Sequence, residues 1–289
     1  MKPAPFAYVR PRGLQHALEA LAADPGAKVL AGGQSLVPLL NMRLAAPTTL
    51  VDINGLPDLA EVEVADDGVR IGALVRHADV LASAAVRRVQ PLVPLALGHV
   101  AHATIRNRGT TVGSLVHADA AAEMPMVLAL LGGSVTVAST AGTRTIEAAD
   151  LYAGPMESTL RHDEIAVDAF FPALGPGEGV AFAEIARRNG DYAVCGVGAV
   201  VRRDGDEVVA ARAGYLSVAE VPTVVDLTAA LGGAVSASST DTAGDMALEQ
   251  LDPLDDLHAS AEYRSHLVRV LTARVLRAAY DHGRRGEAR

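Results

Sequence analysis

Apolar and polar residues follow two different periods along the chain, and the changes between them predict an α/β organisation in the first half. Apolar residues at helical spacing predict a helix over 12–23, and short apolar runs predict strands at about 27–31 and 49–53. Alternating patterns on both sides of Asp67-Gly68 and of Ala141-Gly142 predict two hairpins. Further helices are expected at about 76–83, 91–101 and 122–131.

The pattern changes after a Gly- and Pro-rich stretch at 173–179, which reads as a linker. Strands followed by helices are typical of a separate α+β domain. The segment 234–245, "AVSASSTDTAGD", is expected to be a loop. The strands are predicted at 179–187, 194–202 and 207–218, and the helices at about 223–231 and 259–282.

Composition and charge exclude several classes of function. The chain has 289 residues, a formal net charge of −9 and a pI near 5.4, which argues against nucleic acid and anionic membranes as partners. No apolar run suits a signal peptide or membrane insertion, so a cytoplasmic location is expected. The single cysteine, Cys195, can form neither an internal disulfide nor an iron–sulfur cluster.

The stretch "KVLAGGQS" at 28–35 places two adjacent glycines directly after an apolar run. One interpretation is an ordinary turn from a strand into a helix, with Ser35 as the N-cap. The other is a phosphate-binding loop, because glycines let backbone N–H groups approach an anion closely. In that case only main-chain donors are expected at Ala31-Gly32-Gly33-Gln34-Ser35.

A second stretch, "RNRGTTVGS" at 106–114, is expected to end an extended segment in the same way. It is either a polar loop or a second phosphate cradle, and two such loops could cover two sides of one diphosphate. This differs from the dinucleotide fingerprint, which uses a single G-x-G-x-x-G loop that this chain lacks. Gly196-Val197-Gly198 begins like that fingerprint but reads as strand packing.

The other candidate residues give weaker signals. His117 and Asp119 have no further ligands nearby, so no metal site is expected. Cys195 lies in an apolar run and reads as core, and no residue is predicted to act as a catalytic acid, base or nucleophile. Glu123 could favour a helix start or hold sugar hydroxyls. Tyr192, one of few aromatic residues, could lie over a flat cofactor ring.

Five stretches, in order and over nearly the whole chain, resemble the medium, FAD-binding subunit of molybdenum hydroxylases of the xanthine dehydrogenase and aerobic carbon monoxide dehydrogenase type. They are "PAPFAYVRP", "VLAGGQSLVPLLNMRLAAPTTLVDIN", "IRNRGTTVGSLVHADAAAEMP", "RRNGDYA" and "ASAEYRSHLVRVLTARVL". The resemblance implies an α+β protein. Its two-subdomain FAD-binding domain, of the vanillyl-alcohol oxidase type, would span 1–175 (subdomains about 1–57 and 58–175). A smaller C-terminal α+β domain, with a three-stranded antiparallel sheet and helices, would span 177–285.

The resemblance also implies which residues contact FAD. The family's second loop usually reads Thr-Ile-Gly-Gly, whereas this chain has Thr111-Val112-Gly113. The β-branched Val112 would be strained there if its φ were positive. Ala120 likewise stands where the family usually has proline. The implied contacts are Val29, Leu30, Ala31, Gly32, Gly33, Gln34, Ser35 and Leu36 along the diphosphate and ribityl chain, Thr110, Thr111, Val112, Gly113 and Ser114 on the diphosphate, Glu123 on a sugar, Ile165 and Ala183 near the flavin, and Tyr192 near the isoalloxazine ring.

By the same resemblance, the chain is the electron-transfer subunit of a three-subunit complex, assembled as a dimer of heterotrimers. A large molybdenum–pterin subunit would oxidise the substrate, and a small subunit with two two-iron, two-sulfur clusters would pass electrons to this FAD. An external acceptor would then receive them. Two other functions stay open from the sequence: a self-sufficient FAD-dependent oxidase or reductase of the same fold, and a ligand-binding or scaffolding protein with vestigial loops.

Overall fold

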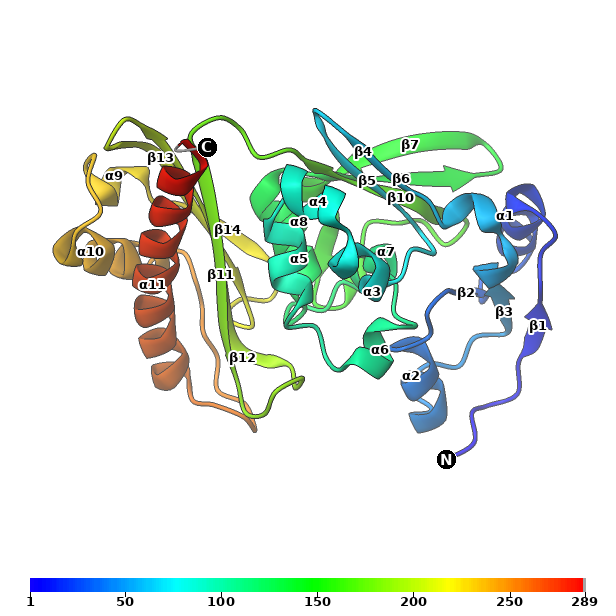
Figure 1. Cartoon of the computed structure of the whole chain (residues 1–289). Helices are drawn as coiled ribbons and strands as arrows, with labels where there is room; N and C mark the ends of the chain where they lie inside the picture. The colour runs from blue at the N-terminus through cyan, green and yellow to red at the C-terminus, as the bar shows by residue number, and fades with distance from the viewer. Residues whose placement is uncertain (288–289) are drawn as a thin grey trace.

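The computed structural model describes residues 1–287, and three α/β units lie side by side along an elongated molecule (Figure 1). The N-terminal unit (blue) is at one end, the central unit (cyan to green) lies in the middle, and the C-terminal unit (light green to red) is at the other end. Within the described residues, we find no helix that combines the length and the apolar character needed to cross a bilayer.

The N-terminal unit is a small parallel sheet of order β1-β3-β2. The predicted helix over 12–23 and both predicted strands are present. Pro38 does not interrupt the second helix, because it lies in the first turn, where a missing N–H costs no intrahelical bond. The elements are β1 (Ala7–Val9), α1 (Leu14–Ala23), β2 (Lys28–Leu30), α2 (Leu36–Met42), β3 (Thr49–Asp52), η1 (Ile53–Gly55) and η2 (Pro57–Leu59).

The central unit is an antiparallel sheet of order β4-β5-β10-β6-β7, with short helices packed against it. Both predicted hairpins are present. The strands are β4 (Val62–Ala65), β5 (Gly68–Gly72), β6 (Ser134–Ser139), β7 (Gly142–Glu147), β8 (Tyr152–Gly154), β9 (Glu157–Ser158) and β10 (Ile165–Pro172). The helices are α3 (His77–Ala82), α4 (Ala84–Val89), α5 (Leu92–Leu97), α6 (Ala103–Arg106), α7 (Thr111–His117), α8 (Glu123–Leu131) and η3 (Ala148–Asp150).

The C-terminal sheet has four antiparallel strands, so the expected three-stranded sheet was wrong. The additional strand, β14, lies where a helix was predicted at 223–231. Its β-branched residues pair with β13, from Tyr215 opposite Thr223 to Arg212 opposite Asp226, and bury Val225 completely. The elements are β11 (Glu178–Ala186), β12 (Ala193–Asp204), β13 (Glu207–Leu216), β14 (Thr223–Asp226), α9 (Thr228–Leu231), α10 (Ala237–Leu248) and α11 (Ala261–Glu287).

Helix α10 occupies the segment that the sequence indicated to be a loop. Its serines made that segment look irregular, but Ser236 and Ser239 form a capping box at the helix start. The small residues then allow close packing: a Cβ on Gly244 would lie 2.9 Å from the Cα of Arg269 in α11. The tertiary contact with α11 therefore decides a helix that local composition disfavours.

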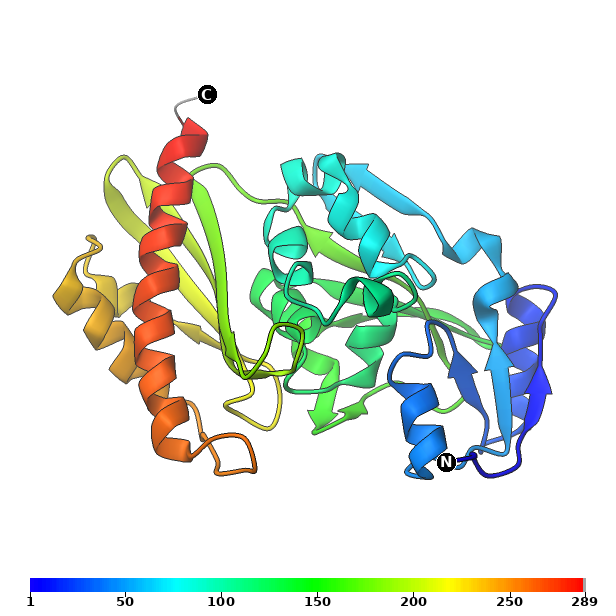
Figure 2. The ribbon, with the colours of Figure 1, turned by 60° about the horizontal axis from the view of Figure 1, so that its bottom comes forward.

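The C-terminal sheet is covered on both faces. Helices α10 and α11 cover the outer face, and α8 of the central unit packs on the inner face (Figure 2). Gly198 and Gly214 make this inner contact possible, because a Cβ on either would lie within 3.0 Å of the Met126 side chain. The interpretation of the Gly-Val-Gly stretch as strand packing is therefore confirmed. One hydrophobic core runs from the N-terminal unit to Val180, Val200 and Leu216 of this sheet.

Candidate functional site

The first glycine loop, residues 31–35, packs directly on the second, residues 108–114. A Cβ added to Gly32 would lie 2.4 Å from the carbonyl oxygen of Arg108 and 2.9 Å from the Cα of Gly109. The bare backbone at Gly32 thus makes room for the other loop, a role that neither of the two interpretations of the sequence included. Gly33 has a φ of +73°, which favours glycine for conformational reasons.

The first loop offers several backbone donors. Within the described residues, no hydrogen-bond acceptor pairs with the amide N–H groups of Gly32, Gly33, Gln34 or Ser35. Ser35 does occupy the N-cap position of α2, but its hydroxyl makes no capping hydrogen bond. Successive unpaired N–H groups are a suitable cradle for an anion such as a phosphate. The loop therefore forms the turn from strand to helix and keeps backbone donors that could face a phosphate, so the two interpretations are compatible.

The second loop follows helix α6, where an extended segment was expected, and leads into α7. The Thr110 hydroxyl caps α7 by accepting from the Gly113 amide at 3.2 Å, and Thr110 and Thr111 are buried. Val112 has helical backbone and is 2% exposed, so the strain considered for a β-branched residue here does not arise. Ser114 is half-buried in the same helix.

A hydrogen-bond network that the sequence did not reveal ties the two loops together. The Asn54 side-chain amide donates to the Ala31 carbonyl at 2.7 Å, and its oxygen accepts from Arg76 at 2.8 Å. The other guanidinium nitrogen of Arg76 donates to the Arg108 carbonyl at 2.8 Å. Arg76 therefore contacts the second loop directly and the first loop through Asn54, which places a cationic side chain beside loops that were expected to offer main-chain donors.

His77 forms two hydrogen bonds with the second loop. Its Nδ1 lies 3.2 Å from the Thr111 hydroxyl, and its amide donates to the Gly109 carbonyl at 3.0 Å. Burial, and then the positive charge of Arg106, lowers the pKa of His77 to about 4. The ring is therefore neutral at physiological pH and acts as a packed hydrogen-bonding support for this loop.

Helix α6 connects the loops to the C-terminal domain. Its C-terminal side leads to Arg108, which touches Gly32. At the other end, a Cβ on Gly190 would lie 2.4 Å from Cε1 of His102, just before the helix. The turn between β11 and β12 therefore packs against the beginning of α6, between the loops and the C-terminal sheet (Figure 1). Tyr192, 63% exposed, lies at the end of this turn.

Glu123 begins α8 and is 7% exposed. Burial, and then the negative charge of Glu184, raises the pKa of Glu123 to about 7. Glu184 pairs with His99 at 3.3 Å, and this hydrogen bond raises the pKa of His99. Glu123 can therefore act as a hydrogen-bond donor or acceptor near neutral pH.

Two further candidate residues pack in the hydrophobic cores of the two domains. Ile165 is 2% exposed at the start of β10, in the main core. The Ala183 side chain packs against the core of the C-terminal domain, so its methyl group faces away from the loops. Cys195 is buried as predicted, and burial raises the pKa of its thiol to about 12, which rules out a thiolate nucleophile.

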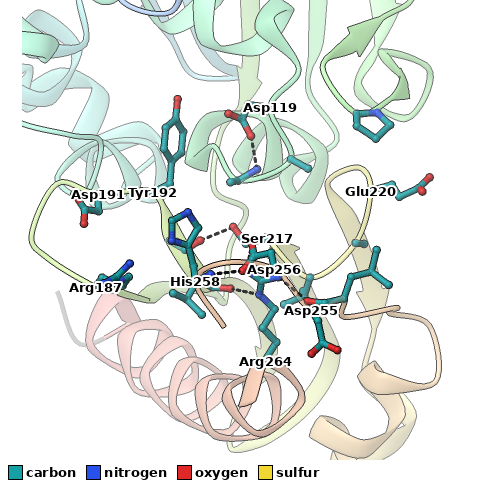
Figure 3. A pocket seen from close by; sticks show the side chains of 18 of the residues that line it. Asp119, Arg187, Asp191, Tyr192, Ser217, Glu220, Asp255, Asp256, His258 and Arg264 are labelled. Carbon is teal, nitrogen blue, oxygen red and sulfur yellow. Dashed lines mark hydrogen bonds and ion pairs between the residues drawn. The ribbon is translucent and has the colours of Figure 1, made fainter. Parts of the chain in front are cut away.

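A hollow of about 850 Å³ opens beside Tyr192, between the central unit and the C-terminal domain (Figure 3). Its walls include Asp119 and Ala120 on one side and the β13–β14 connection on the other. Ser217 joins these walls: its amide donates to the Ala120 carbonyl at 2.9 Å and its hydroxyl to the Ala193 carbonyl at 2.7 Å. No pattern in the sequence predicted this hollow.

The arrangement fits FAD, the cofactor that the resemblance implies. The unpaired amides of the first loop suit a diphosphate, and a buried carboxyl group at Glu123 suits sugar hydroxyls. No group of three or more histidine, cysteine or acidic side chains in residues 1–287 is arranged to bind a metal ion. The chemistry that these residues support is the binding and orientation of a cofactor.

Comparisons with known proteins agree with this assignment along the whole chain. Residues 4–174 match the family described as the FAD binding domain in molybdopterin dehydrogenase, and residues 180–279 match the CO dehydrogenase flavoprotein C-terminal domain. The nicotine 6-hydroxylase medium subunit of Paenarthrobacter nicotinovorans is 39% identical over 96% of this chain and 98% of its own. The carbon monoxide dehydrogenase medium chain of Hydrogenophaga pseudoflava is 30% identical over 97% of this chain and 99% of its own.

Solved structures show the same fold. A chain of quinoline 2-oxidoreductase from Pseudomonas putida 86 superposes with a TM-score of 0.92 at 37% identity, covering 98% of this chain and 99% of that one. The implied flavoprotein fold, with an FAD-binding and a C-terminal domain, is thus confirmed. The chain belongs to the FAD-binding medium subunits of molybdopterin-dependent dehydrogenases, and it is an oxidoreductase subunit whose cofactor is FAD.

Proposed function

We propose that this chain is the electron-transfer subunit of a molybdenum hydroxylase complex. It accepts electrons from the iron–sulfur clusters of a small subunit, which receives them from a large molybdenum–pterin subunit, and passes them to an external acceptor. The relatives named as medium subunits support partners of this kind. The complex is a dimer of heterotrimers in the cytoplasm. Because the only cysteine of the chain is buried, the clusters belong to another subunit.

The observation that carries this function is the pair of interlocked glycine loops with unpaired amides. We assign the FAD diphosphate to these loops, since Asn54 and Arg76 hold them in one fixed arrangement. Glu123 then binds a sugar hydroxyl, and Tyr192 lies against the isoalloxazine ring. The assigned contacts are residues 29–36 and 110–114, Glu123, Ile165, Ala183 and Tyr192; Ala183 contributes through its backbone, because its methyl group faces the C-terminal core.

FAD, when bound, supplies the redox chemistry by taking up electrons singly and releasing them to the acceptor. The residues of this chain bind and orient it. The loops bind the diphosphate through backbone amides. Glu123 holds a proton at its carboxyl group near neutral pH. No residue has to act as an acid or base toward the substrate, because that reaction belongs to the large subunit.

Affinity purification from the source cells tests the proposal. A tagged chain should copurify with two further subunits, with iron and molybdenum in a ratio of about four to one and one FAD per chain. When the complex is given its substrate without oxygen, the flavin should bleach; the isolated FAD-loaded chain should not respond. Bleaching of the isolated chain would instead support a self-sufficient oxidase or reductase, and a colourless protein after incubation with FAD would support a scaffold.

A further inference from the structure

The hollow beside Tyr192 is next to the position proposed for the flavin ring. Tyr192 forms part of its wall, and residues 119–121, just before the FAD-binding candidate Glu123, form another part. Its volume of about 850 Å³ lies within the range of small-molecule sites. The two hydrogen bonds of Ser217 connect both walls, so the hollow is built into the fold.

The side chains that line this hollow carry a net negative charge. Six acidic residues line it against two arginines, a formal charge of −6 + 2 = −4 with His258 taken as neutral. One arginine, Arg264, is neutralised by Asp256 at 2.7 Å. Only Arg187 then balances the other acids, which are Asp119, Asp191, Glu220, Asp252 and Asp255.

Such a hollow repels anions and tolerates uncharged molecules. Like charges concentrated in a cleft act over several ångströms and lower the local concentration of an anionic ligand. Between the acids, the wall is apolar, with alanine, valine and leucine side chains such as Ala219, Val218 and Leu254. An uncharged planar molecule can therefore bury its ring there without desolvating a charge of its own.

We infer that this hollow binds the external electron acceptor, and that the acceptor is an uncharged planar molecule of the quinone type rather than an anionic nicotinamide dinucleotide. This assignment rests on the proposed function and specifies its last step. In that step FADH₂ and the quinone react to give FAD and the hydroquinone: two electrons and two protons leave the flavin, and both arrive on the quinone oxygens.

Matched acceptors test this inference directly. The FAD-loaded full chain is reduced by light without oxygen and mixed rapidly with 1,4-naphthoquinone or with its 2-sulfonate, which adds one negative charge to the same ring. Naphthoquinone should reoxidise the flavin faster than its sulfonate, and the difference should shrink as salt is raised. NAD⁺ at millimolar concentration should neither bind nor reoxidise the flavin.

Two sets of variants locate the effect. Asp191 and Glu220 are exposed and make no side-chain hydrogen bond or ion pair with the described residues, so the double variant Asp191→Asn/Glu220→Gln changes charge alone. It should raise the rate with the sulfonate about threefold per charge and leave naphthoquinone nearly unchanged. The matched control Glu63→Gln/Asp66→Asn, on the β4–β5 hairpin, should change neither rate.

Filling the hollow gives an independent measurement. Ala219→Trp should slow naphthoquinone at least tenfold while FAD content stays normal, because Ala219 lines the hollow and is not among the residues assigned to FAD. Ala219 also packs against the C-terminal core, so thermal unfolding of the variant is measured alongside. Equal rates for both quinones in all variants would overturn the inference and leave the proposed function standing. The same holds for saturable reoxidation of the flavin by NAD⁺ that Ala219→Trp abolishes. Failure of the wild-type chain to bind FAD would instead count against the flavin site itself.

Discussion

At the scale of single residues, the loops depend on close backbone contact. Replacing Gly32 by Val places a side chain against the Arg108 carbonyl and should separate the loops. We expect FAD content to fall sharply and stability to drop by about 1–3 kcal/mol. Absorbance at flavin and protein wavelengths, with thermal unfolding, measures both. Gly13→Val is the control, since no described residue beyond its two chain neighbours lies within 4 Å of its Cβ position; a fully yellow Gly32→Val protein would contradict the assignment.

Asn54 should matter as much as the glycines. Asn54→Ala leaves the Ala31 carbonyl and one Arg76 nitrogen without a partner, which should cost about 1–3 kcal/mol and weaken FAD binding. Chemical denaturation and FAD titration measure the two effects. Asn107→Ala, at an exposed position just before the second loop, serves as the control. An Asn54→Ala protein with wild-type affinity for FAD would show that the network does not position the loops.

The raised pKa of Glu123 predicts how stability varies with pH in the protein without FAD. Between the usual value of 4.5 and about 7, the folded state holds a proton that the unfolded state has lost. Stability should therefore decrease as pH rises through this window, by up to about 3 kcal/mol, and level off above it. Glu123→Gln should remove this slope in urea unfolding at pH 5 and pH 8. An equal slope in the variant would place the titrating group elsewhere.

At the scale of elements, glycine determines how α8 meets the C-terminal sheet. A Cβ on Gly214 would lie 2.6 Å from the Met126 sulfur, so Gly214→Val should push α8 outward and cost about 1–3 kcal/mol. Met126→Ala in the same chain should restore part of this stability by making room. Thermal unfolding of the two variants measures the compensation. Additive losses in the double variant would show that the strain lies elsewhere.

Elements also show where local patterns were sufficient. Helix α1 and both central hairpins follow from strong periodicity and Gly-containing turns, and the structure has them. Strand β14 and helix α10 did not follow, because pairing with β13 and packing on α11 decide them. The signals were present as the β-branched residues Thr223, Val224 and Val225 and as Ser236 before the helix, but each competed with a different local interpretation.

At the scale of the whole molecule, the continuous core predicts cooperative unfolding. It joins the FAD-binding domain to Val180, Val200 and Leu216 of the C-terminal sheet. We expect a single transition, in which hydrogen-exchange protection of β6 and of β13 is lost at the same denaturant concentration. Earlier loss in either strand would show that the two domains unfold independently.

The sequence by itself determined the glycine loops, the single buried cysteine, the periodic elements and, through ordered motifs, the resemblance to FAD-binding medium subunits. These features are local, so adjacent residues specify them. Only the tertiary structure decided that Gly32 faces Arg108, that Asn54 and Arg76 join the loops, that His102 meets Gly190, and that an acidic hollow opens beside Tyr192. Each depends on contacts between residues far apart in the chain, and no local pattern encodes which distant backbone will lie against a given glycine.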